Sequence, residues 1–193
     1  MYPGDLTDRQ WFRLSPPLNE PRGGRHAGGR PRKHAQRRVV DALLYVVKTG
    51  CQWRQLPSDF PPWKTVHEHF RAWRDSGVWE RIGQTLREQG RKAGGRNAKP
   101  TVAIIDSQSA RAARLRCGQE NRRAKDMFDY SVEIVQRNEQ HMFRILPKRW
   151  IVQRTFAGLN WSRRLSKDYE LRHTSAETMI HISFAHLLLR PSP

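Results

Sequence analysis

The chain has 193 residues, which is enough for one ordinary domain or two small ones. Lys and Arg number 36 against 18 Asp and Glu, so the formal net charge is +18 and the pI is near 11.2. A surplus of this size favours a polyanionic partner, because each neutralised phosphate releases a counterion. Cys51 and Cys117 are far apart and lack a C-x-x-C neighbour, which argues against a disulfide scaffold or a structural zinc site.

The first ninety residues predict a small bundle of helices. Thr7 and Gln10 have the spacing of a capping box at the start of a short helix. The segment 21–38 contains seven basic residues, four glycines and no acidic residue. Such a segment cannot bury enough apolar surface to become ordered, so we predict a mobile basic arm. A second helix is expected over 35–48, and Gly50 is expected to stop it.

A third helix is the candidate for DNA recognition. Thr65 and Glu68 have capping-box spacing, which predicts a helix that begins there and runs to Gly77. A helix that follows a short connection and has a basic side can enter the major groove, as in helix-turn-helix proteins. The polar side of this helix carries Lys64, His67, Arg71 and Arg74. A fourth helix, over 78–89, is expected to close the bundle.

The pattern changes after a polar linker over 91–100, where we place a domain boundary. The run TVAIID, residues 101–106, indicates a buried strand, and residues 131–135 are a second strand candidate. Helices are expected over 148–163 and 175–189. The predicted fold class is therefore α + α/β: helical residues 1–90, followed after the linker by α/β residues 101–193.

Six sequence blocks support a more specific interpretation. They are YPGDLTDRQW, GGRPRK, LLYVVKTGCQWRQLP, DFPPW, IIDSQS and PKRWIVQRTFAGLNWSRRLSKDYE. Together they resemble the DDE-type transposases of bacterial insertion sequences. The resemblance implies a helix-turn-helix-like domain over 1–90 that binds the terminal inverted repeats of a mobile element. It also implies an RNase H-like domain over 101–193 that cuts DNA and joins strands.

The resemblance also locates the catalytic site. In that family three carboxylates hold two Mg²⁺ ions, which activate the attacking and the leaving oxygen. Asp106 corresponds to the first catalytic, metal-binding Asp, at the end of a buried strand. Gln153 stands where the family has the catalytic Glu, within a W-x-V-E-R-T-F helix, and the strand that carries the second Asp is missing. We therefore interpret the RNase H-like domain as incomplete, Mg²⁺ as not functionally bound and this copy as catalytically defective.

Basic residues in three places are candidates for DNA contacts. GGRPRK, residues 28–33, resembles the core of an AT-hook, which lies in the minor groove of A·T-rich DNA, although a non-specific phosphate-binding arm is an equal alternative. The family contacts the cleaved DNA end around the Gln153 helix, where a solvated helix face is the alternative. The candidates in the arm, the recognition helix and the Gln153 segment are Arg30, Arg32, Lys33, Lys64, Arg71, Arg74, Arg154, Arg163 and Arg164.

The sequence thus predicts an insertion-sequence transposase that binds terminal repeats without strand transfer. Two alternatives stay open, a non-enzymatic DNA-binding regulator that inhibits an intact transposase, and a poorly folded remnant. The expected partners are double-stranded DNA and, because the incomplete sheet would expose strand edges, a second copy or an intact transposase. The longest apolar stretch, 180–189, is too short for a membrane span. We expect a bacterial cytoplasmic protein associated with the nucleoid.

Overall fold

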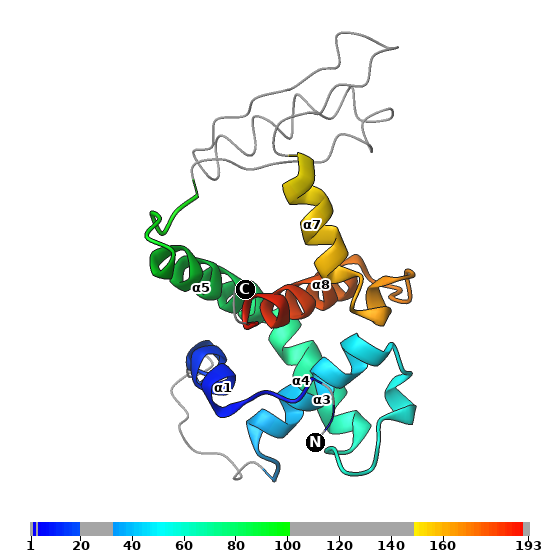
Figure 1. Ribbon diagram of the computed structural model, residues 1–193. Helices are drawn as coiled ribbons and strands as arrows, with labels where there is room; N and C mark the ends of the chain where they lie inside the picture. The colour runs from blue at the N-terminus through cyan, green and yellow to red at the C-terminus, as the bar shows by residue number, and fades with distance from the viewer. Residues whose placement is uncertain (1, 3, 20–32, 101–148, 191–193) are drawn as a thin grey trace, which may run out of the picture. The chain divides into compact units, whose positions relative to one another are not determined.

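The computed structural model describes Tyr2 and residues 4–19, 33–100 and 149–190 (Figure 1). Within these ranges the chain forms α-helices and short 3₁₀ helices, and no strand. The strands expected at 101–106 and 131–135 lie outside the described residues, so the α/β class of the second half stays a prediction. Residues 1–96 and 158–193 form one compact unit, here called the first unit, and residues 97–157 form the second.

The N-terminal helices follow their sequence signals. Helix α1 spans Asp8–Leu14, and its capping box is confirmed: Gln10 donates its backbone N–H to the Thr7 hydroxyl, and Thr7 donates its own to the Gln10 side chain. Helix α2, Pro16–Asn19, follows directly. Helix α3, Gln36–Thr49, overlaps the end of the predicted arm, because its first turns are held by Val39 and Val40, which are buried in the core.

Gly50 ends α3, as predicted, and is required there for two reasons. Its φ of 70° lies in the left-handed region that favours glycine. A Cβ at this position would also lie 3.3 Å from the backbone carbonyl carbon of Arg163, from a distant part of the chain. Gly50 therefore allows the C-terminal segment to approach the end of α3 closely.

The third and fourth helices have different ends from those predicted. Helix α4 spans Trp63–Asp75, and the capping box expected at Thr65 and Glu68 is wrong, because no side chain caps the helix and Pro62 is its N-cap. Proline has a fixed φ that suits a helix start, so the turn after Pro62 begins the helix before Thr65. Helix α5 spans Val78–Ala93 and so extends beyond residue 89. A short 3₁₀ helix, η1, occupies Trp53–Gln55 before α4.

The C-terminal segment contains two α-helices and a short 3₁₀ helix. Helix α7 spans Arg149–Leu159, η3 spans Arg163–Leu165 and α8 spans His173–Leu188. The helix predicted over 148–163 therefore ends four residues early. The chain turns there, and the hydroxyl of Ser162 lies 2.5 Å from that of Ser183 on α8, buried in the first unit.

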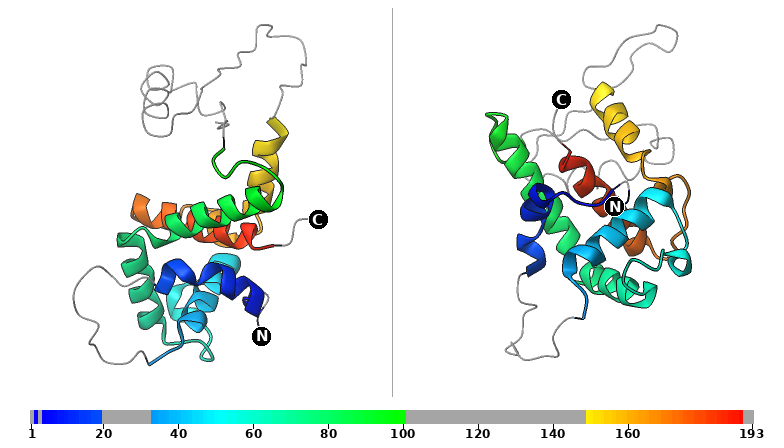
Figure 2. Two further views of the ribbon diagram at one scale, coloured as in Figure 1. Left: turned by 90° about the vertical axis from the view of Figure 1, so that its left-hand side faces the viewer. Right: turned by 60° about the horizontal axis from the view of Figure 1, so that its bottom comes forward.

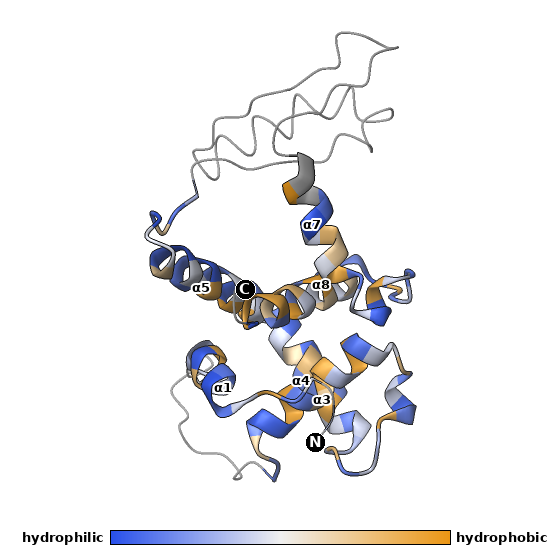
Figure 3. Cartoon of the chain, in the orientation of Figure 1, coloured by the Kyte–Doolittle hydropathy of each residue, from blue (hydrophilic) through white to orange (hydrophobic). Residues whose placement is uncertain are grey.

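Helix α8 completes the core of the first unit. It packs along α5 and against α3, and the two views of Figure 2 show it beside α5. The sequence predicts these C-terminal residues to lie in the second domain, whereas α8 buries one face against the N-terminal helices. Apolar colours gather where α3, α4 and α8 meet (Figure 3). The buried side chains here are Val39, Leu43 and Leu44 of α3, Phe70 and Trp73 of α4, Trp79, Ile82 and Leu86 of α5, and Met179, Ile182 and Ala185 of α8.

Candidate nucleic-acid interface

The polar side of α4 is the first part of the candidate interface. Residues 64, 67, 71 and 74 are three or four positions apart, so they share one side of the helix. Lys64 and Arg71 are exposed. His67 is half-buried beside the indole of Trp53, with the ring centroids 5.0 Å apart. The structure therefore brings the predicted residues together but exposes only part of the set.

Arg74 is held by neighbouring residues. Its side chain is only 10% exposed, and its guanidinium lies 2.8 Å from the carboxylate of Asp75. It also donates a hydrogen bond of 3.1 Å to the hydroxyl of Ser175 on α8. Arg74 therefore ties α4 to α8, and its charge is partly neutralised inside the protein.

Arg164 is more deeply engaged. Two of its guanidinium nitrogens donate to one carboxylate oxygen of Glu170, at 2.9 and 2.7 Å, and a third nitrogen donates to the carbonyl of Cys51 at 3.1 Å. The two side chains are 8% and 15% exposed. The guanidinium also lies over the ring of Tyr169, 5.4 Å from its centroid. Arg164 thus fixes the segment that carries Tyr169 and Glu170.

A groove of about 480 Å³ lies on the first unit between η1, α4 and the segment that leads into α8. We call it the α4 groove. Leu171 is fully exposed there. The residues that line the groove are Trp53, His67, Arg71, Arg74, Arg164, Tyr169, Glu170, Leu171, Arg172 and Ser175. Within the described part of the chain no carboxylate pairs with Arg71 or Arg172, and both are exposed. Because Glu170 is occupied by Arg164, the groove presents a surplus of positive charge.

His67 is the titratable ring of the α4 groove. Burial lowers its pKa, and the nearby positive charge of Arg71 lowers it further. Glu170 opposes this shift but does not cancel it. The ring is therefore neutral at pH 7 and adds a polar edge, but no charge, to the groove.

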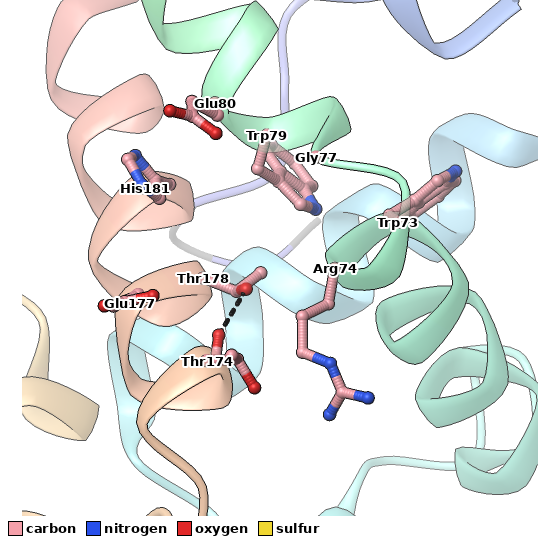
Figure 4. A pocket seen from close by; sticks show the side chains of 9 residues that line it. All are labelled: Trp73, Arg74, Gly77, Trp79, Glu80, Thr174, Glu177, Thr178 and His181. Atoms are coloured by element: carbon pink, nitrogen blue, oxygen red, sulfur yellow. Dashed lines mark hydrogen bonds between the residues drawn. The ribbon is translucent and has the colours of Figure 1, made fainter. Parts of the chain in front are cut away.

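A smaller pocket lies between the end of α4, α5 and α8 (Figure 4). Its volume is about 130 Å³, and its lining includes Arg74 and His181 together with the carboxylates of Glu80 and Glu177. Figure 4 shows the Thr178 hydroxyl bonded to the carbonyl of Thr174, at 2.7 Å. The mixed charges and small volume suit an anion less well than the α4 groove does.

The other predicted site residues are scattered or undescribed. Gln153 and Arg154 are exposed on α7 in the second unit, and Arg163 is exposed on η3 in the first. Lys33 is exposed at the edge of the described chain. The candidates that lie outside the described residues are Arg30, Arg32 and Asp106.

Sequence reasoning missed Trp53, Tyr169 and Arg172 as parts of a groove. Over a hundred residues separate Trp53 from the other two, so no local pattern connects them. Among the described residues, no three or more His, Cys, Asp or Glu side chains come together as metal ligands would. No helix in the described ranges is long and apolar enough to cross a membrane.

Comparison with known proteins gives matches in both halves of the chain. Residues 6–83 match the family described as "Putative transposase of IS4/5 family", and residues 101–190 match a transposase DDE domain. An uncharacterized 16.2 kDa protein of insertion element IS402 from Burkholderia cepacia is 30% identical over 109 residues, 55% of this chain and 73% of the relative. The uncharacterized protein y4sN of Sinorhizobium fredii is 30% identical over 123 residues, 62% of this chain and 85% of the relative. No solved structure matches the chain.

Proposed function

Because the chain belongs to the insertion-element transposases, we propose that its first unit binds the terminal inverted repeats of a mobile element and that this copy does not transfer strands. The observation that carries the binding proposal is the exposed basic surface of α4 and its groove. Lys64, Arg71 and Arg172 present unburied positive charge there, on a chain of net charge +18. Such charges neutralise phosphates and position a protein on the duplex.

The fold of the first unit supports this role. Helix α4 packs against α3 and α5 through Val66, Phe70 and Trp73, and it also contacts η1 and α8. The side chains that it leaves to solvent are Lys64, Glu68, Arg71 and Asp75. A helix held in this way can lie in the major groove of B-DNA, which is about 12 Å wide. The packed core also favours a folded DNA-binding unit over the alternative of a poorly folded remnant.

The catalytic part of the proposal depends on Gln153. Members of the DDE family use divalent metal ions, which prefer anionic oxygen ligands. The side chain of Gln153 is exposed on α7 and offers only a neutral carbonyl oxygen. Asp106 would hold a Mg²⁺ ion in the family's arrangement, but the neutral amide of Gln153 in place of the Glu suits a doubly charged ion poorly. We therefore derive no catalytic step for this chain.

A binding titration of the full chain tests the first part. Fluorescence anisotropy would compare a duplex that carries the element's own terminal repeat with a scrambled duplex, over a range of salt concentrations. We expect tighter binding to the repeat at physiological salt. Equal binding to both that falls steeply with salt would reduce the interaction to phosphate attraction, and no binding at low salt would refute the proposal.

A cleavage assay tests the second part. The purified chain, incubated with Mg²⁺ and a labelled terminal repeat, should leave both strands intact. Cut strands would overturn the assignment of a catalytic defect. If binding occurs without cleavage, the chain can occupy element ends and exclude an intact transposase. Because Gln153 is neutral, the second candidate function is a regulator that binds element ends without cutting them.

A further inference from the structure

The α4 groove has the size of a ligand site. Its volume of about 480 Å³ falls within the range of roughly 300–1,000 Å³ that small-molecule sites occupy. Three segments build it: η1 contributes Trp53, α4 contributes His67 and Arg71, and the segment after η3 contributes Tyr169 and Arg172. The site therefore depends on the packing of the C-terminal segment against α4.

The charges of the groove favour an anionic ligand. The guanidinium of Arg164 is occupied by Glu170, and that of Arg74 by Asp75 and Ser175. Arg71 and Arg172 are exposed at the groove, and within the described residues no carboxylate is paired with either. Two arginines without internal partners are suited to a phosphate group, which accepts their planar N–H donors.

Two aromatic side chains of the groove, Trp53 and Tyr169, favour contact with a nucleobase. Trp53 is half-buried, and Tyr169 is 50% exposed, with the guanidinium of Arg164 near its ring. Aromatic side chains stack on unpaired bases, and every base offers a π-face, so this contact is tolerant of sequence. A paired base inside a duplex is already stacked on its neighbours and presents only its edges.

Leu171 adds an apolar side chain to the lining of the α4 groove. Its side chain is fully exposed at the groove, beside Tyr169 and Arg172. Apolar side chains can insert between base steps and fill the gap that an extruded base leaves. An aromatic wall next to such a wedge suits a strand that leaves the helical stack.

From these observations we propose that the α4 groove takes one unpaired nucleotide of a DNA strand. Arg71 and Arg172 hold its phosphate, Trp53 and Tyr169 contact its base, and Leu171 covers the exposed end of the duplex. The inference rests on the proposed DNA binding and adds to it, because it assigns a second DNA structure to the same surface.

Anisotropy titrations of the full chain test this with four labelled DNAs of one sequence. They are a blunt duplex, a duplex with a short single-stranded tail, the same duplex with an abasic tail, and the single strand alone. The normal tail should increase affinity about tenfold over the blunt duplex, and the abasic tail should not, because it keeps the phosphates but lacks the stacking base. An equal gain from both tails, or none from either, would overturn the proposal.

Two variants and a matched control connect the gain to the groove. Tyr169→Leu should remove the gain from the normal tail and leave blunt-duplex affinity within about threefold, because it keeps every charge of the surface. Arg172→Ala should also remove the gain, and it should weaken binding of the blunt duplex as well, because it removes one phosphate contact. Arg190→Ala is the control, because Arg190 is exposed near Trp161 and does not line the groove, and its loss removes the same charge. A gain that survives both groove variants would contradict the assignment.

The outcomes separate this inference from the proposed function. Loss of all binding, including that of the blunt duplex, would refute the proposed function itself. Binding of the blunt duplex without any preference for the tailed duplex would refute only the nucleotide site. The abasic comparison uses the unaltered chain, so the result does not depend on the folding of a variant.

Discussion

Helices α7 and α8 come from the same half of the sequence but differ in their packing. Helix α8 buries Met179 and Ile182, each at most 1% exposed, in the core of the first unit. Helix α7 leaves Ile151 37% exposed and Phe156 54% exposed. The C-terminal half of the chain is therefore not one packing unit, because its last helix stabilises the N-terminal helices. This packing supports the proposal that the first unit binds DNA whether or not the chain transfers strands.

The largest expected effect comes from removing a buried side chain of α8. Ile182→Ala should lower the free energy of unfolding by about 4 kcal/mol, because it removes buried methyl groups and leaves a cavity. Ile180→Ala is the matched control on the same helix, where the side chain is 45% exposed and the cost should be about 0.5 kcal/mol. Urea denaturation followed by circular dichroism measures both. Equal costs would contradict the packing of α8 described here.

The ion pair between Arg164 and Glu170 should come next. Arg164→Ala leaves the carboxylate of Glu170 largely buried without its partner, which should cost about 3 kcal/mol of unfolding free energy. Arg163→Ala, one residue away and exposed, should change stability by less than about 0.5 kcal/mol. Thermal and urea unfolding of the two variants provide the comparison. A larger loss for Arg163→Ala would reverse the roles assigned to these neighbours.

Acid pH should lower the free energy of unfolding through protonation of His186 on α8. Burial, reinforced by Arg190 and Lys48, lowers the pKa of His186 from 6.5 to about 4. The unfolded chain therefore binds a proton between pH 6.5 and about 4 that the folded chain does not, so stability is present above pH 6.5 and is lost as the pH falls. The loss should reach roughly 2 kcal/mol after allowance for solvent screening.

Urea denaturation at several pH values between 4 and 7 measures this loss. His186→Gln should flatten the pH dependence of stability in that interval, because glutamine does not titrate. An unchanged slope in this variant would assign the acid sensitivity to other groups.

The smallest effect is expected on α7. Phe156→Ser replaces a side chain that is 54% exposed, so it should change the free energy of unfolding by about 0.5 kcal/mol or less. Urea denaturation beside Ile182→Ala makes the contrast with α8 direct. A cost of several kcal/mol at Phe156 would show that α7 is packed as firmly as α8, and the comparison would fail.

Local signals in the sequence predicted the N-terminal helices well. The capping box of Thr7 and Gln10 and the stop at Gly50 depend on residues within a few positions, so they could be read directly. The box expected at Thr65 was wrong, because Pro62 begins α4 earlier. Lys64 and Arg71 are exposed on α4, and their role in DNA binding stays a prediction.

The sequence by itself determined the family and the surplus of positive charge, because each is a property of residue identity. It also predicted that Gln153 stands in place of a catalytic carboxylate. Only the tertiary structure decided that α8 completes the first unit, that Arg164 is held by Glu170, and that Trp53 and Arg172 line one groove. These features join segments more than a hundred residues apart or depend on burial. A pattern of neighbouring residues encodes neither the contacts between distant segments nor the burial of a side chain, because both arise when separate apolar faces pack together.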